Sequence, residues 1–135
     1  MILIACVDNK NGMMFNHRRQ SQDKVLRADI LSLIKGKKLW MNAYSRKQFT
    51  EENADQIETE ETFSDKAGSG EYCFAENADF FKDADKIEEI YMYHWNRDYP
   101  ADVYFPIDLS SWKCVETAEF AGSSHEKITR ERYVR

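Results

Sequence analysis

The chain has 135 residues, 42% of them hydrophobic, which favours one domain spanning residues 1–135 and excludes tandem domains or a solenoid. With 32% charged residues, two prolines and five glycines, the composition also excludes a disordered or collagen-like protein. The net charge of −5 disfavours broad binding to nucleic acid or to an anionic membrane. The first 50 residues, however, carry ten Lys or Arg against three Asp, so this part of the chain suits a small anionic ligand.

An apolar run over 1–7 predicts a short strand that is buried on both faces. The run has no basic leader and is interrupted by Asp8, so we expect neither a signal peptide nor a membrane span, and a cytoplasmic location. Three widely spaced cysteines, Cys6, Cys73 and Cys114, lie in apolar runs. We expect them to be reduced thiols in the core, which agrees with that location.

The next elements predict a crossover between two strands. Turn-forming residues over 8–12 are followed by the periodicity of an amphipathic helix over 22–35, with Ser21 as its N-cap and Gly36 at its end. A second strand is predicted over 37–43, and Ser45 is expected to cap a short helix that reaches residue 49. Strand, helix and strand in this order indicate a right-handed crossover.

The second half of the chain predicts further strands and a closing hairpin. Residues 51–65 include seven acidic and no basic side chains, which predicts an exposed segment, with Thr59 capping a short helix over 60–66. Strands are predicted over 71–75 and 87–95, with at most one helical turn over 79–81 and an irregular connection between Pro100 and Pro106. The alternating segments 112–120 and 128–134 predict an antiparallel hairpin.

Common cofactor and metal motifs are absent from the sequence. Gly68 and Gly70 precede a strand, whereas a phosphate-binding glycine loop follows a strand and opens a helix. His125 and Glu126 begin a pattern typical of zinc proteases, but the second histidine is replaced by Thr129. We therefore expect no metal site.

Two polar loops carry the candidate site residues. The first lies between the first strand and the first helix, where α/β proteins commonly bind ligands, and its arginines and histidine suit a phosphate or a carboxylate. The second is the turn of the last hairpin, where His125 and Glu126 are candidate catalytic residues beside serine hydroxyls. A solvated loop and ordinary turn chemistry are the alternatives. The predicted ligand-binding residues are Asn16, His17, Arg18, Arg19 and Ser124.

The order of these segments resembles the dihydrofolate reductase family. The first strand with residues 8–13 is similar to that family's first strand and substrate loop, and residues 39–41 with Ser45 to its second strand and next helix. Residues 87–94, 102–106 and Trp112 are similar to its late strand, acidic-aromatic-proline loop and final hairpin. The resemblance implies an α/β fold of three layers, with a mixed central sheet and a C-terminal antiparallel hairpin.

The family's catalytic positions are only partly matched in this sequence. Its catalytic carboxylate opens the first long helix, where Asp23 is the nearest candidate, and Asp29 lies deeper in the helix. The threonine that partners this acid is replaced by Tyr93. The resemblance therefore implies a catalytic role for Asp23.

The family's cofactor-binding turns are also altered. Its glycine-rich turn falls on residues 75–77, where the charge of Glu76 should obstruct a diphosphate. Its basic turn after the second strand retains only Ser45 and Arg46, and the segment expected around the adenosine is short and acidic. Since the nicotinamide carries the hydride chemistry, we expect no cofactor and no reductase activity.

The sequence thus predicts a dihydrofolate reductase-like protein that binds a small anionic or nucleotide-like ligand. The expected cleft is lined by residues 17–19 and approached by residues 124–126. Three alternatives stay open: a nuclease or RNA-processing hydrolase that uses His17, Arg18 and Arg19 with His125 and Glu126; an NADPH-dependent reductase; and a non-enzymatic interaction module. The oligomeric state is left open.

Overall fold

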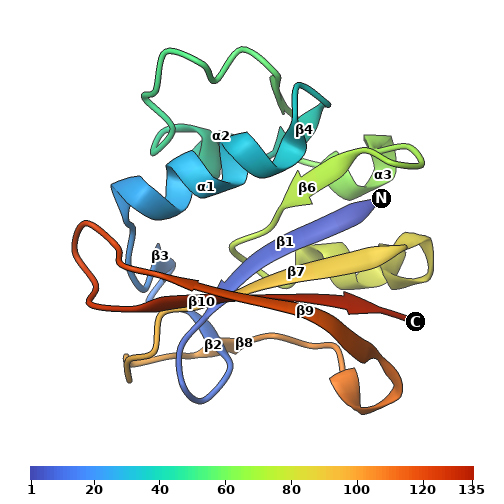
Figure 1. Ribbon diagram of the computed structural model, residues 1–135. Coiled ribbons are helices and arrows are strands. Elements are labelled where there is room, and N and C mark those ends of the chain that lie inside the picture. Colours follow the sequence, from blue (N-terminus) through green and yellow to red (C-terminus); the bar gives the residue numbers. More distant parts are fainter.

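A computed structural model describes residues 1–135 and places a seven-stranded sheet between two layers of helices and loops (Figure 1). The strands of this sheet are β1 (Ile2–Val7), β4 (Leu39–Met41), β5 (Ile57–Thr59), β6 (Tyr72–Phe74), β7 (Glu89–His94), β9 (Lys113–Phe120) and β10 (Ile128–Val134). The helices are α1 (Lys24–Ile34), α2 (Ala43–Arg46) and α3 (Phe63–Lys66), with 3₁₀ helices η1 (Asp79–Lys86) and η2 (Leu109–Ser111).

The order of the strands in the large sheet is β5-β4-β6-β1-β7-β10-β9. Strand β1 runs parallel to both of its neighbours, with Ile4 opposite Phe74 of β6 and Tyr91 of β7. Strand β10 runs antiparallel to β7 and β9. This topology confirms the mixed central sheet and the C-terminal antiparallel hairpin, and it gathers the carboxyl ends of β4, β6, β1 and β7 at one end of the sheet.

The core lies on both faces of this sheet, because successive side chains of a strand point to opposite faces. On one face, Ile2 and Ile4 of β1 belong to a cluster with the buried stripe of α1, including Leu26 and Ile30. On the other face, Leu3 and its neighbours pack with residues of β2, α3 and η1. The apolar run at the start of the chain is therefore a strand buried on both faces, as expected, and the fold has three layers.

A second sheet of three short strands, β2 (Gly12–Phe15), β3 (Arg18–Arg19) and β8 (Val103–Tyr104), has the order β3-β2-β8. Asn16 and His17 join β2 to β3 with φ values of 52° and 63°, the pattern of a two-residue hairpin turn with two left-handed residues. Part of the expected polar loop is thus a β-hairpin. Strand β8 falls in the segment that was expected to be irregular, where it pairs with β2.

The structure corrects two predicted helix caps. Asp23, not Ser21, caps α1, because its carboxylate accepts hydrogen bonds from the backbone N–H groups of Val25 and Leu26 at 2.9 and 3.2 Å. The helix ends with Lys35 in the left-handed conformation, next to Gly36. Asn42 caps α2 through the backbone N–H of Ser45, so Ser45 lies inside the helix.

The segment between α2 and β7 also differs from expectation in two places. Thr59 ends the edge strand β5, which pairs in parallel with β4, and does not cap a helix. Helix α3 begins at Phe63, and η1 spans eight residues in two helical pieces that meet at a kink at Asp83, where one turn was expected. Strand β5 is stabilised by its backbone hydrogen bonds to β4. The local sequence of β5 does not indicate this neighbour, so the strand was not predicted.

The three cysteines are free thiols in three different environments. Cys73 is buried, Cys6 is partly buried and Cys114 is exposed on the edge strand β9. The expectation of a core position is therefore wrong for Cys114, because β9 has only one neighbouring strand and little packed against its faces. None of the helices has the length and apolar character that crossing a membrane requires.

Candidate functional site

A cleft of about 570 Å³ opens at the end of the large sheet where the parallel strands finish. Its walls come from the residues after β4 and β6, from the β2–β3 hairpin and from β8, so it joins the two sheets. In α/β folds, ligands bind in this position, outside the carboxyl ends of the strands. The lining residues are Met14, His17, Asn42, Tyr44, Asn77, Asp79, Asp102 and Val103.

A mostly buried carboxylate, Glu76, lies beside the cleft and binds Arg19 and Ser45. Its side chain is 9% exposed. Arg19 of β3 donates to both of its oxygens, from Nε at 2.8 Å and from Nη2 at 3.1 Å. The hydroxyl of Ser45 in α2 donates to it at 2.8 Å. Glu76 therefore connects the turn after β6 to α2 and to the small sheet.

Arg19 is fixed by Tyr44 as well as by Glu76. Its guanidinium lies 4.3 Å from the centre of the Tyr44 ring, and it donates to the Tyr44 carbonyl oxygen at 3.1 Å. Burial opposes the guanidinium charge, but the pairing with Glu76 outweighs it, and the pKa of Arg19 rises above its usual range. This predicted ligand residue is thus charged and already paired within the chain.

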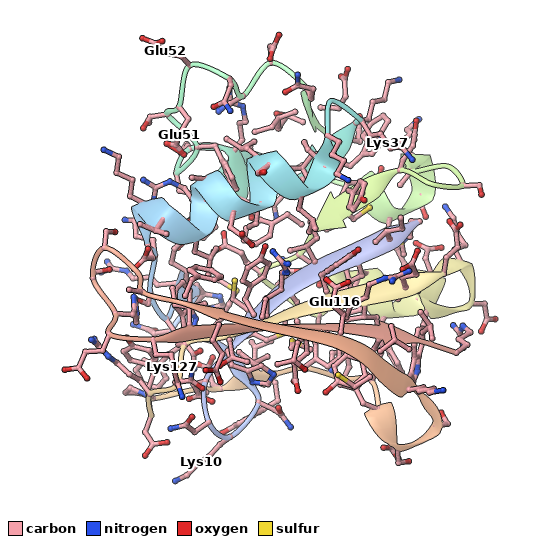
Figure 2. All side chains as sticks on the ribbon, in the orientation of Figure 1. Lys10, Lys37, Glu51, Glu52, Glu116 and Lys127 are labelled. Atoms are coloured by element: carbon pink, nitrogen blue, oxygen red, sulfur yellow. The ribbon has the colours of Figure 1, made fainter.

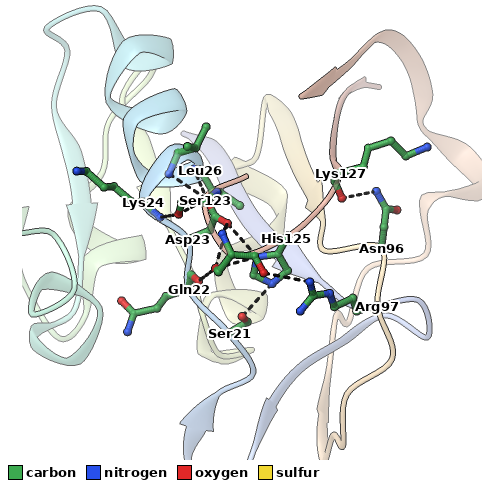
Figure 3. Close-up of polar contacts among 12 residues, drawn as sticks. Ser21, Gln22, Asp23, Lys24, Leu26, Asn96, Arg97, Ser123, His125 and Lys127 are labelled. Carbon is green, nitrogen blue, oxygen red and sulfur yellow. Dashed lines mark hydrogen bonds and ion pairs between the residues drawn. The ribbon is translucent and has the colours of Figure 1, made fainter. Parts of the chain in front are cut away.

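Asp23, Ser124 and His125 come together at the start of α1. Figure 3 shows His125 and Ser123 beside Asp23. One oxygen of Asp23 accepts from the backbone N–H of Ser124 at 2.8 Å, from its hydroxyl at 3.1 Å and from His125 Nδ1 at 2.9 Å. The other oxygen holds the helix cap and accepts from the backbone N–H of Ser123 at 3.0 Å. Gly122 is required beside this pair, because a Cβ there would overlap the Asp23 carboxylate.

The Asp23–His125 pair is enclosed by its neighbours. The side chains are 0% and 1% exposed, and the imidazole stacks on Trp95 with 4.6 Å between ring centres. His125 Nε2 lies 3.0 Å from the Ser21 hydroxyl and 3.1 Å from the Tyr99 hydroxyl, so both ring nitrogens have partners. Burial acts to raise the pKa of Asp23, but the hydrogen bonds from His125 and the hairpin lower it well below its usual range.

The other predicted site residues face different cavities. His17 lines the cleft described above. Asn16 and Arg18 line a shallow cavity of about 290 Å³ together with Arg19 and Tyr99. Glu126 borders another cavity of about 370 Å³, beside Trp95, Asn96, Arg97 and Lys127. The structure therefore brings together Asp23, Ser124 and His125, but it does not place them in one cleft with the basic residues.

A pair that the sequence reasoning set aside is joined in the structure. The Tyr93 hydroxyl donates to Asp29 Oδ2 at 2.5 Å, and Arg130 Nη1 donates to the same oxygen at 2.7 Å. Burial, followed by the charge of Asp29, raises the pKa of Tyr93 far above its usual range, so the phenol keeps its proton. The sequence feature that could have indicated this pair is an acidic residue of α1 directly before the buried Ile30.

The acidic and amide residues of the cleft were also missed. Asn42 follows β4 directly, and Asn77 and Asp79 follow β6. Their positions directly after strands could have identified them from the sequence. Asp102 could not be identified in this way, because it reaches the cleft only where the small sheet packs beside the large one. No group of three or more His, Cys, Asp or Glu side chains is arranged to hold a metal ion.

Comparison with known proteins identifies the fold. No family model and no curated protein sequence matches the chain. Among solved structures, the dihydrofolate reductase from Enterococcus faecalis, complexed with NADP(H) and RAB-propyl, superposes with a TM-score of 0.67 at 13% sequence identity. The match covers 99% of this chain and 95% of that chain. The fold is therefore that of dihydrofolate reductase, as the sequence resemblance implied.

Proposed function

We propose that this chain uses the dihydrofolate reductase fold to bind a small polar ligand without a nicotinamide dinucleotide. The binding site is the cleft between the residues after β4 and β6 and the small sheet. The position of Glu76 carries the proposal. Glu76 itself and its partner Ser45 lie in the two turns that the resemblance assigns to the cofactor phosphates, and Arg19 of β3 also pairs with the carboxylate.

The residues of these turns do not fit a diphosphate. Ser45 donates to Glu76, and Arg46 donates to the carbonyl oxygen of Phe49, so the two retained family residues are both occupied. Freeing Arg19 for a phosphate would leave the mostly buried Glu76 carboxylate with Ser45 as its remaining partner, which is unfavourable. This cost argues against the alternative of an NADPH-dependent reductase.

The charge of the cleft disfavours an anion of any kind. Its lining includes Asp79 and Asp102 but no lysine or arginine. Two like charges about 4 Å apart near a protein surface repel by about 4 kcal/mol. The cleft therefore favours an uncharged or cationic ligand, in place of the anion that we expected from the basic loop.

The hydrogen-bonding groups of the cleft specify the ligand further. The amide oxygens of Asn42 and Asn77 accept from backbone N–H groups of the chain, which leaves their NH₂ groups free to donate. The carboxylates can only accept when ionised. Tyr44, Met14 and Val103 supply apolar surface. We therefore propose an amino-substituted aromatic heterocycle, whose ring contacts this surface and whose N–H groups reach the carboxylates.

The other functions are less well supported by the geometry. A hydrolase that uses His125 and Glu126 with the basic loop needs these groups at one substrate, and His125 is enclosed with both nitrogens bonded. Glu126 and His17 border separate cavities. An interaction module without a ligand does not account for the polar cleft. We therefore place ligand binding first and leave catalysis unassigned.

Titration of the isotope-labelled chain tests this proposal. We expect adenosine or 2-aminopyridine to shift the side-chain NH₂ signals of Asn42 and Asn77 in amide correlation spectra, and NADPH at the same concentration to leave them unchanged. Asp79→Asn should lower the affinity for the heterocycle by about tenfold, because a hydrogen bond to a charged group contributes about 1.5–3 kcal/mol. Asp98→Asn removes an exposed acid outside the cleft and is the matched control. Shifts produced by NADPH, or equal losses in both variants, would contradict the proposal.

A further inference from the structure

A second cavity, of about 500 Å³, lies between the C-terminal half of α1 and the sheet. It shares no residue with the proposed ligand cleft and lies over the same face of the sheet as α1. Figure 2 labels Lys37, beyond the end of α1, and Glu116 on β9, which both belong to its lining. The full lining is Asp29, Ser32, Leu33, Ile34, Lys35, Lys37, Tyr72, Tyr91, Glu116 and Arg130.

The cavity is lined by two tyrosine hydroxyls that have no hydrogen-bond partner in the chain. Tyr72 is 8% exposed, and its hydroxyl makes no hydrogen bond within the chain, although the oxygen keeps access to the cavity. Tyr91 lies beside it with 6.4 Å between ring centres, and its hydroxyl also has no partner. Both hydroxyls open to the cavity, so each is free to donate a hydrogen bond to a ligand that binds there.

Both tyrosines act as donors at neutral pH. Burial, and then the nearby charge of Glu89, raises the pKa of Tyr72, and burial likewise raises the pKa of Tyr91. A protonated phenol donates one hydrogen bond. The two hydroxyls therefore suit a ligand that carries acceptor oxygens.

The unpaired charge in the cavity is positive. Arg130 is bound to Asp29 at 2.7 Å and lies 3.6 Å from Glu116, so the acids of the cavity have a partner. Lys35 and Lys37 form no ion pair and lie on the segment that follows α1. A bound anion would therefore meet two free ammonium groups and two phenol donors.

We propose that this cavity binds a small aromatic anion, a carboxylate or a phosphate ester, whose ring contacts the tyrosines and whose oxygens accept from Tyr72, Tyr91 and the lysines. The ring contact follows from the two tyrosine faces and from Leu33 and Ile34. The ligand would differ from that of the cleft both in charge and in place.

Titrations with benzoate and phenyl phosphate test the proposal, with benzyl alcohol as the uncharged control. We expect one or both anions to shift the backbone amide signals of residues 33–37, 72 and 91, and benzyl alcohol to leave them unchanged. The anion that binds more tightly identifies the preferred head group. The absence of these shifts with both anions, or equal shifts with benzyl alcohol, would overturn the proposal.

Substitutions test the individual donors. Tyr72→Phe keeps the ring and removes the hydroxyl, and we expect about a tenfold loss of anion affinity. Lys37→Gln should weaken binding by about threefold and reduce its dependence on salt. Lys47→Gln, at an exposed lysine outside the cavity, is the matched control. Unchanged affinity in Tyr72→Phe, with an unchanged melting temperature, would contradict the proposal.

The two binding proposals can fail separately. Asp79→Asn alters the cleft and should leave benzoate binding unchanged, whereas Tyr72→Phe should leave binding of the heterocycle unchanged. Loss of both activities in either variant would indicate one shared site and would overturn the assignment of a distinct anion cavity.

Discussion

At the scale of single residues, the most constrained groups are acids that the chain itself binds. Asp23 holds a helix cap, a hairpin and a histidine with its two oxygens, and Glu76 holds a serine and an arginine from two other elements. The sequence singled out the same two side chains for other reasons, Asp23 as the candidate catalytic acid of the resemblance and Glu76 as an obstacle to a diphosphate. Their contacts show that each charge also has a role in holding the fold together.

The Asp23–His125 pair gives a prediction for stability and its pH dependence. Asp23→Asn should lower the free energy of unfolding by about 3 kcal/mol near neutral pH, because it breaks a buried pair and weakens a helix cap. Since the pKa of Asp23 is lowered in the folded chain, its contribution is complete above the unfolded value of about 4 and is lost as the pH falls further. Urea unfolding between acidic and neutral pH measures both effects. Asp98→Asn is the control and should keep the wild-type pH dependence of the free energy of unfolding. The same pH dependence in Asp23→Asn would contradict the assignment.

At the scale of elements, the β2–β3 hairpin has strain at the edge of the cleft. Asn16 and His17 both adopt positive φ values. Asparagine tolerates this conformation, whereas at His17 it costs about 1–2 kcal/mol. His17 also lines the cleft, so this turn places an imidazole at the proposed ligand site.

Substitution at this turn tests the balance between strain and function. His17→Gly should raise the free energy of unfolding by about 0.5–1 kcal/mol, because Asn-Gly is the preferred sequence of such turns. We expect the same change to weaken binding of the heterocycle in the cleft. His17→Ala is the control, since it removes the imidazole but keeps the strained Cβ and should not stabilise the chain. Urea denaturation and the ligand titration give the two readings, and a destabilised His17→Gly chain would count against this account.

At the scale of the whole molecule, the two sheets are joined through the Arg19–Glu76 ion pair. The side chains are 18% and 9% exposed, and the partners are 57 residues apart in the sequence. The cleft lies beside this connection, so its shape depends on how the small sheet is held against the large one.

Removal of this connection should loosen the small sheet. Glu76→Ala leaves Arg19 without its carboxylate, and we expect a loss of about 3 kcal/mol in the free energy of unfolding. Amide hydrogen exchange in β2 and β3 should become faster, while exchange in β1 and β7 changes only with global stability. Asp65→Ala removes an exposed partner of Lys82 and should alter neither measurement. Unchanged protection of β2 and β3 in Glu76→Ala would show that the ion pair does not hold the sheet.

The order of the main elements, the burial of the first strand and the resemblance to the dihydrofolate reductase fold could all be predicted from the amino-acid sequence. These features follow from local apolar patterns and turn residues, which a sequence displays directly. The sequence also marked Glu76 as an obstacle to a diphosphate, although not its partners. Three features became visible only in the folded chain: the contact of Asp29 with Tyr93, the buried pairing of Asp23 with His125, and the division of the basic loop between separate cavities. The physical reason is that these contacts join residues far apart in the chain, and packing selects one partner for each charge from many that the composition allows.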